Sequence, residues 1–349
     1  MKDFQCECGN RIFFFNNRCL SCERRLGFDP NLLIMRAFPK TDGWLRSDSG
    51  EDFNYCQNYY DFNACNWLVK KGSKNRYCLS CRLNKTVPDL VSAENINRWS
   101  KLEAAKRHLI YSLLSLGLPI QSDKHAPVRL AFAFLEDART NPNYAESFVA
   151  TGHSSGLITI NLAEADDAYR ERVKEELGEH YRTILGHFRH EIGHYYYEML
   201  VARTSWRAPF EALFGNPQLD YQQALKAHYQ QPQMENWQSA YISSYAQSHP
   251  LEDWAETWAH YLHILDTLDT AIHFKLVEPL QKNGRVDAGE AIEQWLALSV
   301  KLNALNRSMG LPDAYPFVIT PKITEKLKLI HRVIEHQTTA MVATGQRLQ

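Results

Sequence analysis

The chain has 349 residues, of which 44% are hydrophobic and 23% are charged, and its formal net charge at pH 7 is −1. This composition is ordinary for a soluble globular protein of two or three domains, and the near-zero charge implies no polyelectrolyte partner along the whole chain. No apolar run reaches the length of a membrane-spanning helix, and the N-terminus has no apolar segment of a secretory signal. We therefore expect a cytoplasmic protein that makes no membrane contact.

All eight cysteines lie in the first quarter of the chain. They are Cys6, Cys8, Cys19, Cys22, Cys56, Cys65, Cys78 and Cys81. In a reducing compartment, clustered cysteines favour metal ligation over disulfides. The first four form two close pairs that can close a tetrahedral zinc site. The last four contain one close pair and two wider-spaced members, and we expect a second four-cysteine zinc site. The alternative for Cys56 and Cys65 is a small buried side chain without metal.

These cysteines predict a zinc-ribbon domain over residues 1–88. The segment Arg11–Phe15 between the first two pairs is typical of a strand, and Asn16-Asn17 is typical of a turn. Residues 1–91 carry 14 Lys+Arg and 10 Asp+Glu, a net charge of only +4. We therefore favour a solvated basic surface that covers a metal-stabilised core. The alternative is that this surface contacts a protein or nucleic acid.

The next segment predicts one long amphipathic helix and a small sheet. Ser92 is suited to the N-cap of the helix, which ends before Gly117-Leu-Pro119. Strands are expected at residues 128–135, 147–151 and 156–161. We expect Gly156–Asn161 to be the edge strand of a peptidase-like lobe, where an extended peptide could add by backbone hydrogen bonds.

The motif with the clearest chemistry is His190-Glu191-x-x-His194, on a predicted helix that ends at Val201 and starts near Tyr181. Positions i and i+4 share one face of a helix, so both imidazoles can reach one metal ion. Glu191 can face a metal-bound water without being a ligand, as the base of a zinc hydrolase does. The alternative is a pair of His residues on a solvated helix face.

A catalytic zinc ion needs a third protein ligand, and a second predicted helix offers one. Pro250 suits its first turn, where Glu252 and Asp253 follow. Glu252 and Glu256 share a face and are both possible ligands. Asp253 points off that face and is the weaker alternative.

The spacing of Tyr245, Glu252 and Glu256 downstream of a His-Glu-x-Gly-His helix resembles the catalytic domain of anthrax lethal factor. The resemblance implies that Tyr245 faces the oxyanion and that Glu252 binds zinc. It also implies that Glu256 accepts a hydrogen bond from the ring of a ligand His and so fixes its tautomer. Helix geometry agrees, because Glu256 lies one turn after Glu252.

A longer pattern extends this resemblance through roughly residue 340. It comprises the strings Gly156–Asp167, His187–Tyr197 and His249–Glu256. They are similar to a bacterial family of zinc-binding metallopeptidases with an N-terminal zinc ribbon, which implies a zinc site and a peptidase-like fold. After them, residues 287–309 and 320–336 predict amphipathic helices, and residues 338–349 predict a frayed end.

Together these patterns predict an α+β chain in which a Cys-rich zinc ribbon precedes a mainly helical, zincin-like domain over residues 92–340. We expect a zinc metallopeptidase with one catalytic and one or two structural zinc ions, acting on a peptide or protein. In this hypothesis Glu191 is the base, Tyr245 the oxyanion donor, and His190, His194 and Glu252 the ligands. The alternatives are a non-proteolytic zinc-ribbon scaffold and a nucleic-acid-associated hydrolase.

Overall fold

The structure is a computed structural model. It describes residues 2–40, 45–47, 50–120, 128–144, 148–177, 182–230, 235–282 and 285–343. These residues form two compact units, one from the segments 1–122 and 130–170 and one mainly from the segment 171–345. The fold is mixed, with a Cys-rich region of small sheets followed by a mainly helical domain, as the sequence predicts. None of the helices in these ranges is long and apolar enough to cross a membrane.

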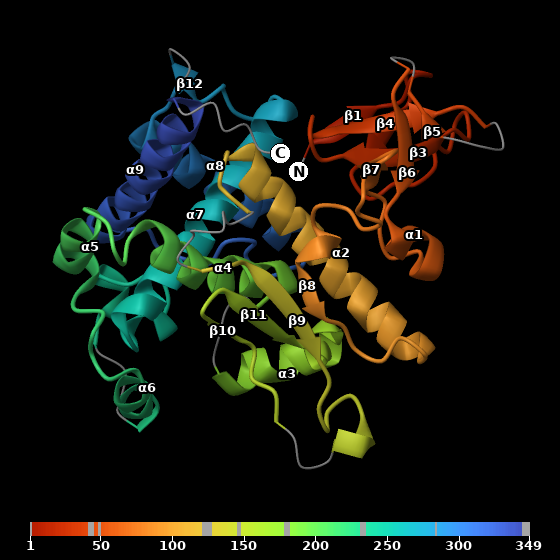
Figure 1. Ribbon diagram of the computed structural model, residues 1–349. Coiled ribbons are helices and arrows are strands. Elements are labelled where there is room, and N and C mark those ends of the chain that lie inside the picture. The colour runs from red at the N-terminus through yellow and green to blue at the C-terminus, as the bar shows by residue number, and fades with distance from the viewer. Residues whose placement is uncertain are drawn as a thin grey trace. The chain divides into compact units, whose positions relative to one another are not determined.

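The Cys-rich region consists of short antiparallel strands around a small core (Figure 1). The strands are β1 (Asp3–Gln5) paired with β2 (Arg11–Phe13), β3 (Arg25–Asp29) paired with β4 (Ile34–Phe38), and the sheet of β5 (Leu45–Arg46), β6 (Asp52–Tyr55) and β7 (Leu68–Lys70). The short helix α1 (Gln57–Phe62) lies between β6 and β7 in the chain. β2 confirms the first part of the strand expected at Arg11–Phe15.

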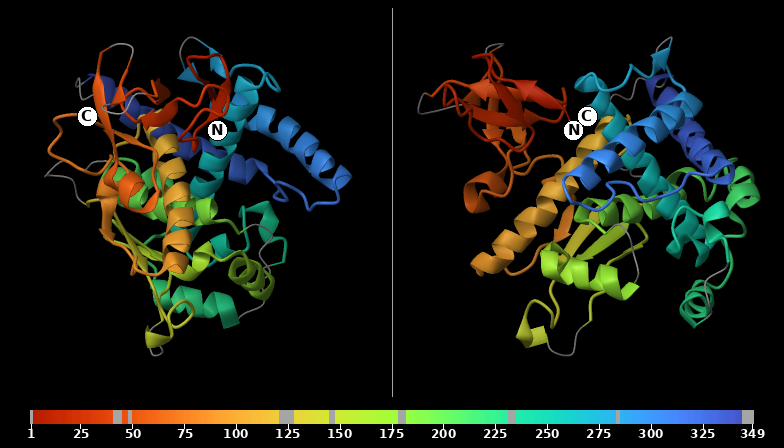
Figure 2. Two further views of the ribbon diagram at one scale, coloured as in Figure 1. Left: turned by 90° about the vertical axis from the view of Figure 1, so that its right-hand side faces the viewer. Right: turned by 180° about the vertical axis from the view of Figure 1, so that it is seen from behind.

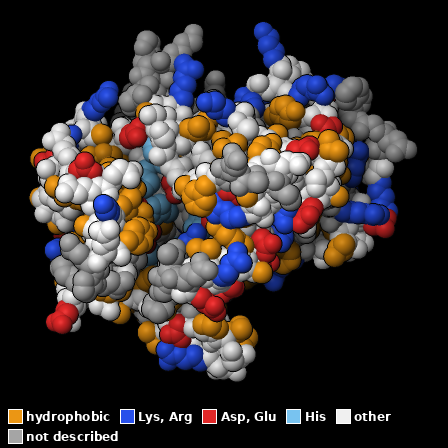
Figure 3. Space-filling view, turned by 90° about the horizontal axis from the view of Figure 1, so that it is seen from below, with side chains coloured by type: hydrophobic (Ala, Val, Ile, Leu, Met, Phe, Trp, Pro, Cys, Tyr) orange, Lys and Arg blue, Asp and Glu red, His pale blue; other side chains and the backbone are white. Residues whose placement is uncertain are grey.

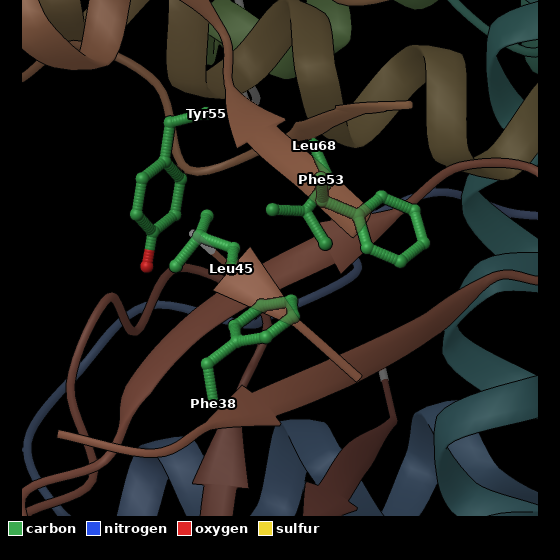
Figure 4. Packing of buried hydrophobic residues seen from close by; sticks show 5 residues of the cluster. All are labelled: Phe38, Leu45, Phe53, Tyr55 and Leu68. Carbon is green, nitrogen blue, oxygen red and sulfur yellow. The ribbon is translucent and has the colours of Figure 1, made fainter. Parts of the chain in front are cut away.

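Five buried side chains from neighbouring strands pack together in this region (Figure 4). They are Phe38, Leu45, Phe53, Tyr55 and Leu68. The hydroxyl of Tyr55 donates to the carbonyl of Leu26 at 2.8 Å, so this polar group is satisfied inside the core. A core of this size stabilises a segment only modestly, which is the situation in which small domains use bound metal.

The first unit also contains a long helix and a four-stranded sheet. Helix α2 (Ala93–Ser115) begins as expected, with the Ser92 side chain accepting from the backbone N–H of Asn95. The sheet has the order β10 (Gly152–Ser154), β11 (Leu157–Asn161), β9 (Ala131–Leu135) and β8 (Asn84–Thr86). β10 and β11 are antiparallel, whereas β11, β9 and β8 run parallel.

The expectation of an edge strand at Gly156–Asn161 is wrong. β11 is bonded on both sides, to β9 along its whole length and to β10 at Leu157–Thr159, so it is not the edge strand of the sheet. The expected strand at 147–151 is also wrong where it is described: residues 148–151 are not a strand, and the edge strand begins at Gly152. The turn Ser155-Gly156, with positive φ at both residues, returns the chain beside β11.

The predicted boundary between residues 88 and 92 stays a prediction. β8 precedes it in the chain, yet β8 pairs with β9, which follows it. Helix α2 likewise contributes Tyr111 to a cluster of aromatic rings with Phe14 and Phe28 of the Cys-rich region, at ring-centroid distances of 5.2 and 5.8 Å. The Cys-rich region and the first elements of the predicted peptidase domain therefore share contacts.

The second unit is helical and is organised around α7 (Figures 1 and 2). Its elements are most of α3 (Asp167–Leu177), then α4 (Ile184–Leu200), α5 (Arg207–Phe214), α6 (Tyr221–Gln230), α7 (Pro250–His273), the hairpin β12 (Gln281–Lys282) and β13 (Arg285–Val286), α8 (Ala288–Ser308) and α9 (Pro321–Ala343). α4, α5, α8 and α9 all pack on α7. The helices expected at 287–309 and 320–336 are confirmed as α8 and α9.

Two predicted helix ends differ from the structure. α4 begins at Ile184, after Thr183, whose hydroxyl accepts from the N–H of Gly186 at 3.0 Å; residue 181 lies outside the described residues. α9 continues to Ala343, past the fraying expected from residue 338, and residues 344–349 are outside the described part. Helix α9 is longer than the apolar periodicity suggested because its sequence contains no proline or glycine after Pro321 until Gly345.

A buried ion pair joins α7 to α9. The ammonium group of Lys326 lies 2.5 Å from the carboxylate of Asp253, and both side chains are 1% exposed. Lys326 also donates to the carbonyl of Ala240 at 2.7 Å. Asp253 is therefore occupied by a cation from another helix, and its carboxylate serves packing between helices.

Replacing Lys326 by Met is expected to destabilise the fold by about 3–5 kcal/mol, because the Asp253 carboxylate would stay buried without its partner. The free energy of unfolding, measured by urea denaturation, checks this. The matched control is Lys328→Met on the same helix, which breaks the exposed ion pair of Lys328 and Glu325. That change is expected to cost at most about 1 kcal/mol, and equal effects of the two changes would contradict the interpretation.

Candidate active site

His190 and His194 lie one turn apart on α4, so that their side chains point to the same side of the helix. Their ring centroids are 5.0 Å apart, and the two Nε2 atoms are 3.3 Å apart. The side chains are 13% and 15% exposed, respectively. The pair is therefore accessible without being a solvated surface pair. In the space-filling view of Figure 3, pale-blue histidine side chains are visible between their neighbours.

Helix α7 supplies the facing carboxylates, and its start is fixed by His249 and Pro250. Pro250 occupies the first turn, where a missing N–H costs nothing. The Nδ1 atom of His249 accepts from the N–H of Leu251 at 3.1 Å, which makes His249 the N-cap. Its Nε2 donates to the carbonyl of Leu219 at 3.2 Å. His249 therefore fixes where the first turn of α7 begins, three residues before Glu252.

Close contact between α4 and α7 depends on Gly193. A Cβ atom at this position would lie 3.0 Å from the Cα of Ala255 and 3.1 Å from the Cβ of Trp258. The carbonyl of Gly193 accepts from the indole N–H of Trp254 at 2.9 Å. A glycine next to His194 thus lets the two helices approach closely enough for a short carboxylate to reach the imidazoles.

Glu252 reaches both imidazoles. One of its oxygens, Oε2, lies 3.0 Å from the Nε2 of His190, and Oε1 lies 3.4 Å from the Nε2 of His194. The Glu252 side chain is 1% exposed. Burial would raise the pKa of Glu252, but the two imidazoles hold it well below the usual range of a carboxyl group. The carboxylate is therefore the favoured form.

Glu256 contacts the other side of the His190 ring. Its Oε1 lies 2.6 Å from the Nδ1 of His190, one turn along α7 from Glu252. In this contact Nδ1 is the donor, because a carboxylate only accepts hydrogen bonds, and Nε2 lies on the side of His194 and Glu252. Of the two carboxylates that the sequence left open, only Glu252 lies among the Nε2 atoms.

Glu191 is 8% exposed and lies next to His190 on the same helix. Burial raises the pKa of its carboxyl, and the nearby imidazoles of His190 and His194 oppose that rise. Tyr245, in a short 3₁₀ turn before α7, has its ring centroid 6.0 Å from that of His190. Burial raises the pKa of Tyr245 far above its usual range, so its hydroxyl keeps its proton.

One residue at the site was not found from the sequence. Tyr221, the first residue of α6, donates from its hydroxyl to Oε1 of Glu252 at 2.7 Å. Tyr221 lies 31 residues before Glu252, and no local pattern marks it, so only the tertiary fold shows the contact.

Two other histidines of α7, His260 and His263, contact aromatic side chains away from the candidate donors. A hydrogen bond of 2.8 Å joins the Nδ1 atom of His260 and the hydroxyl of Tyr315. The ring of His263 packs on Trp295 and Tyr315. Burial lowers the pKa of His260 to about 4 and that of His263 to about 3. Neither His residue lies among the candidate donors.

His190, His194 and Glu252 fit a zinc ion by donor type and by spacing. Each offers a donor atom, and these atoms lie within 4.8 Å of one another. Donors about 2.0–2.1 Å from a tetrahedral zinc ion lie about 3.3–3.4 Å apart. The two Nε2 atoms are 3.3 Å apart, and each has an oxygen of Glu252 close to that distance, Oε2 at 3.0 Å from His190 and Oε1 at 3.4 Å from His194. Two imidazoles and one carboxylate also leave a fourth position for water or substrate.

The cysteines form two further candidate metal groups, as the sequence predicts. They are Cys6, Cys8, Cys19 and Cys22, and Cys56, Cys65, Cys78 and Cys81. Sulfur–sulfur distances of 3.6 Å for Cys6 and Cys22, and 3.8 Å for Cys65 and Cys78, exceed that of a disulfide. They match the separation of about 3.8 Å for thiolates around a tetrahedral zinc ion. Both groups therefore fit zinc.

The second cysteine group has the surroundings of a buried anion. Backbone N–H groups of Trp67 and Cys78 point at the sulfurs of Cys65 and Cys56, at 3.4 and 3.3 Å. Arg107 of α2 is buried nearby, and within the described residues its Nε has no hydrogen-bond partner. Burial alone would lower the pKa of Arg107, but the neighbouring thiolates raise it. A guanidinium that interacts with Cys65, Cys78 and Cys81 suits a zinc ion held by four thiolates, a group that carries net negative charge.

These donor groups define a zinc-binding protein, and comparison with known families agrees. Residues 95–333 match the family described as "Putative zinc-binding metallo-peptidase", and residues 3–92 match a zinc-ribbon domain. The first match covers more than half of the chain, and the chain belongs to this metallopeptidase family. The family supports a zinc-binding metallopeptidase with an N-terminal zinc ribbon, which confirms the second resemblance at this level.

Relatives of similar length occur in mycobacteria. Proteins described as uncharacterized in Mycobacterium tuberculosis (strain ATCC 25618 / H37Rv) and in Mycobacterium bovis (strain ATCC BAA-935 / AF2122/97) are each 42% identical over 343 residues, which is 96% of either chain. No solved structure matches the chain. The resemblance to anthrax lethal factor therefore gains no support from a structural neighbour.

Proposed function

We propose that this protein is a zinc-dependent metallopeptidase whose active site is formed by α4 and α7. The observation that carries the proposal is the convergence of His190, His194 and Glu252 at 3.0–3.4 Å, with Glu191 beside them. The family match to zinc-binding metallopeptidases supports the same reaction class. The substrate class is a peptide or protein.

Three side chains are proposed as ligands of the catalytic zinc ion: His190 and His194 through Nε2, and Glu252 through its carboxylate. When bound, such an ion polarises the scissile carbonyl and makes water a better nucleophile at neutral pH. Glu256 positions the His190 ring by accepting a hydrogen bond from Nδ1, at 2.6 Å. That contact holds the ring in the tautomer that a ligand requires.

Glu191 is proposed as the general base. Its carboxylate takes a proton from the attacking water and passes it to the leaving amine. Because Glu191 is almost completely buried and its carboxyl pKa is raised by that burial, it is a stronger proton acceptor than an exposed carboxylate. Tyr245 is proposed to donate its hydroxyl proton in a hydrogen bond to the oxyanion of the tetrahedral intermediate.

The two cysteine groups are proposed to hold one structural zinc ion each, which gives two in the ribbon and three in the chain. The proposal also divides the chain into a zinc ribbon over residues 1–88 and a peptidase domain over residues 92–340. The zinc ions would stabilise a segment with a small apolar core. An additional proposed role of the ribbon is contact with a protein or nucleic acid.

The proposal is tested by searching for cleavage. The zinc-loaded full chain is incubated with a peptide library made from a bacterial proteome, and new peptide ends are identified by mass spectrometry. We expect cleavage that stops when a chelator removes the catalytic zinc and returns when zinc is restored. New ends that persist after complete removal of that zinc, or no new ends from the fully loaded chain, would contradict a zinc peptidase.

A further inference from the structure

We propose that Tyr221 is a positioning residue of this site, which holds the Glu252 carboxylate in the orientation that binds the metal. This inference rests on the proposed function and extends it to a residue outside the two helices that carry the motif. Tyr221 reaches the site from α6, and its role is separate from that of the three ligands.

Tyr221 contacts the oxygen of Glu252 that faces away from His190. Oε2 lies 3.0 Å from the Nε2 of His190, and Oε1 accepts the Tyr221 hydroxyl at 2.7 Å. A buried carboxylate can rotate about its last bond unless both oxygens have partners. Since Glu252 is 1% exposed, water does not readily replace the phenol. Besides the Nε2 of His194, which is 3.4 Å away, the Tyr221 hydroxyl is the group that holds Oε1 in this rotamer of the ligand.

A carboxylate only accepts hydrogen bonds, so the hydroxyl of Tyr221 is the donor in its contact with Glu252. Its single proton lies between the two residues, and the Tyr221 hydroxyl cannot donate to another group at the same time.

The position of Tyr221 is fixed from the start of α7. The ring centroid of Tyr221 lies 5.2 Å from that of His249, the N-cap of α7. His249 also binds the carbonyl of Leu219, two residues before Tyr221, at 3.2 Å. Asp220 accepts from the N–H of Gln223 at 2.8 Å and starts α6. Because α6 itself has no buried residue, these contacts hold Tyr221 in place.

Replacing Tyr221 by Phe removes the hydroxyl and keeps the ring. We expect zinc to bind the His190 site about 10–100-fold more weakly, the range measured when a partner of a metal ligand is lost. Affinity is measured by titrating the zinc-loaded full chain with a competing chelator. The matched control is Tyr195→Phe on α4, beside His194. Its hydroxyl is buried and has no hydrogen-bond partner within the described residues, so zinc affinity should stay unchanged.

A second readout separates positioning from a general effect on the fold. Cobalt in place of zinc gives visible bands that depend on how the carboxylate binds. Subtracting the spectrum of the double variant His190→Ala, His194→Ala isolates these bands from those of the cysteine groups. We expect Tyr221→Phe to shift the bands and Tyr195→Phe to leave them, while the unfolding temperature without metal at this site is the same in both variants.

Zinc affinity of Tyr221→Phe within about twofold of the wild type would overturn the inference, as would an equal loss in Tyr195→Phe. The failure of the proposed function looks different. If Tyr221→Phe loses affinity but the wild type cleaves no peptide, Tyr221 positions a metal ligand and the peptidase assignment is wrong. If the wild type binds no metal at His190 and His194, both proposals are wrong.

Discussion

Replacing Glu191 by Gln is expected to reduce peptide hydrolysis about 10²–10⁴-fold, the range attributed to a general base, while the zinc content stays the same. The amide has nearly the shape of the carboxylate but cannot accept the proton of the attacking water. Glu191 is not among the three donors that converge at the site, so its loss should not release the metal. The measurement is kcat on a cleaved peptide, together with zinc per chain.

The control for this change is Glu211→Gln on α5, where an exposed carboxylate pairs with Arg207. That variant carries the same chemical change away from the site, and its activity should equal that of the wild type. If Glu191→Gln cleaves at the wild-type rate, Glu191 is not the base. If the variant also loses zinc, its inactivity says nothing about proton transfer.

Replacing Gly193 by Leu is expected to remove zinc from the site and to destabilise the fold by about 1–3 kcal/mol, the usual effect of overpacking. A Cβ at this position already lies 3.0 Å from the Cα of Ala255, and backbone cannot move aside as a flexible side chain can. The remaining carbons of leucine would push α7 away from α4. Glu252 would then move out of reach of His190 and His194.

Metal analysis and urea denaturation of Gly193→Leu measure both effects. The matched control is Gly152→Leu, because a Cβ at Gly152 would meet nothing within 4 Å. Retention of the full zinc content by Gly193→Leu would show that close contact of the two helices does not set the ligand geometry. A zinc content that falls in Gly193→Ala and falls further in Gly193→Leu would show that the contact between the two helices sets the ligand geometry.

The helical part of the site could be predicted because its information is local. Spacing of four residues places His190 with His194, and Glu252 with Glu256, in each case on one helix face. Spacing alone could not decide which of the two Glu residues lies among the Nε2 atoms. That choice depends on how α4 and α7 pack, through Gly193, and the distances place Glu252 there and Glu256 at Nδ1.

Features that depend on contacts far apart in the chain were missed. Gly156–Asn161 has the residues of a strand, but the very short β10 covers the edge that was expected to be open. Tyr221 carries no sequence signal at all. The position of Asp253 on the helix already argued against a role as metal ligand. Its partner in the interior is Lys326, which lies 73 residues later in the chain. Sequence periodicity predicts the helix or strand face on which a side chain lies, but it does not identify the residue that contacts this side chain.

Zinc counted per chain tests the central claim most directly, because the three donor groups are independent. Mass-spectrometric metal analysis of the purified full chain should give about three zinc ions, one for each donor group. The double variant His190→Ala, His194→Ala should give about two and should lose all peptide cleavage. Equal zinc contents in the wild type and the double variant would contradict a metal centre at His190, His194 and Glu252.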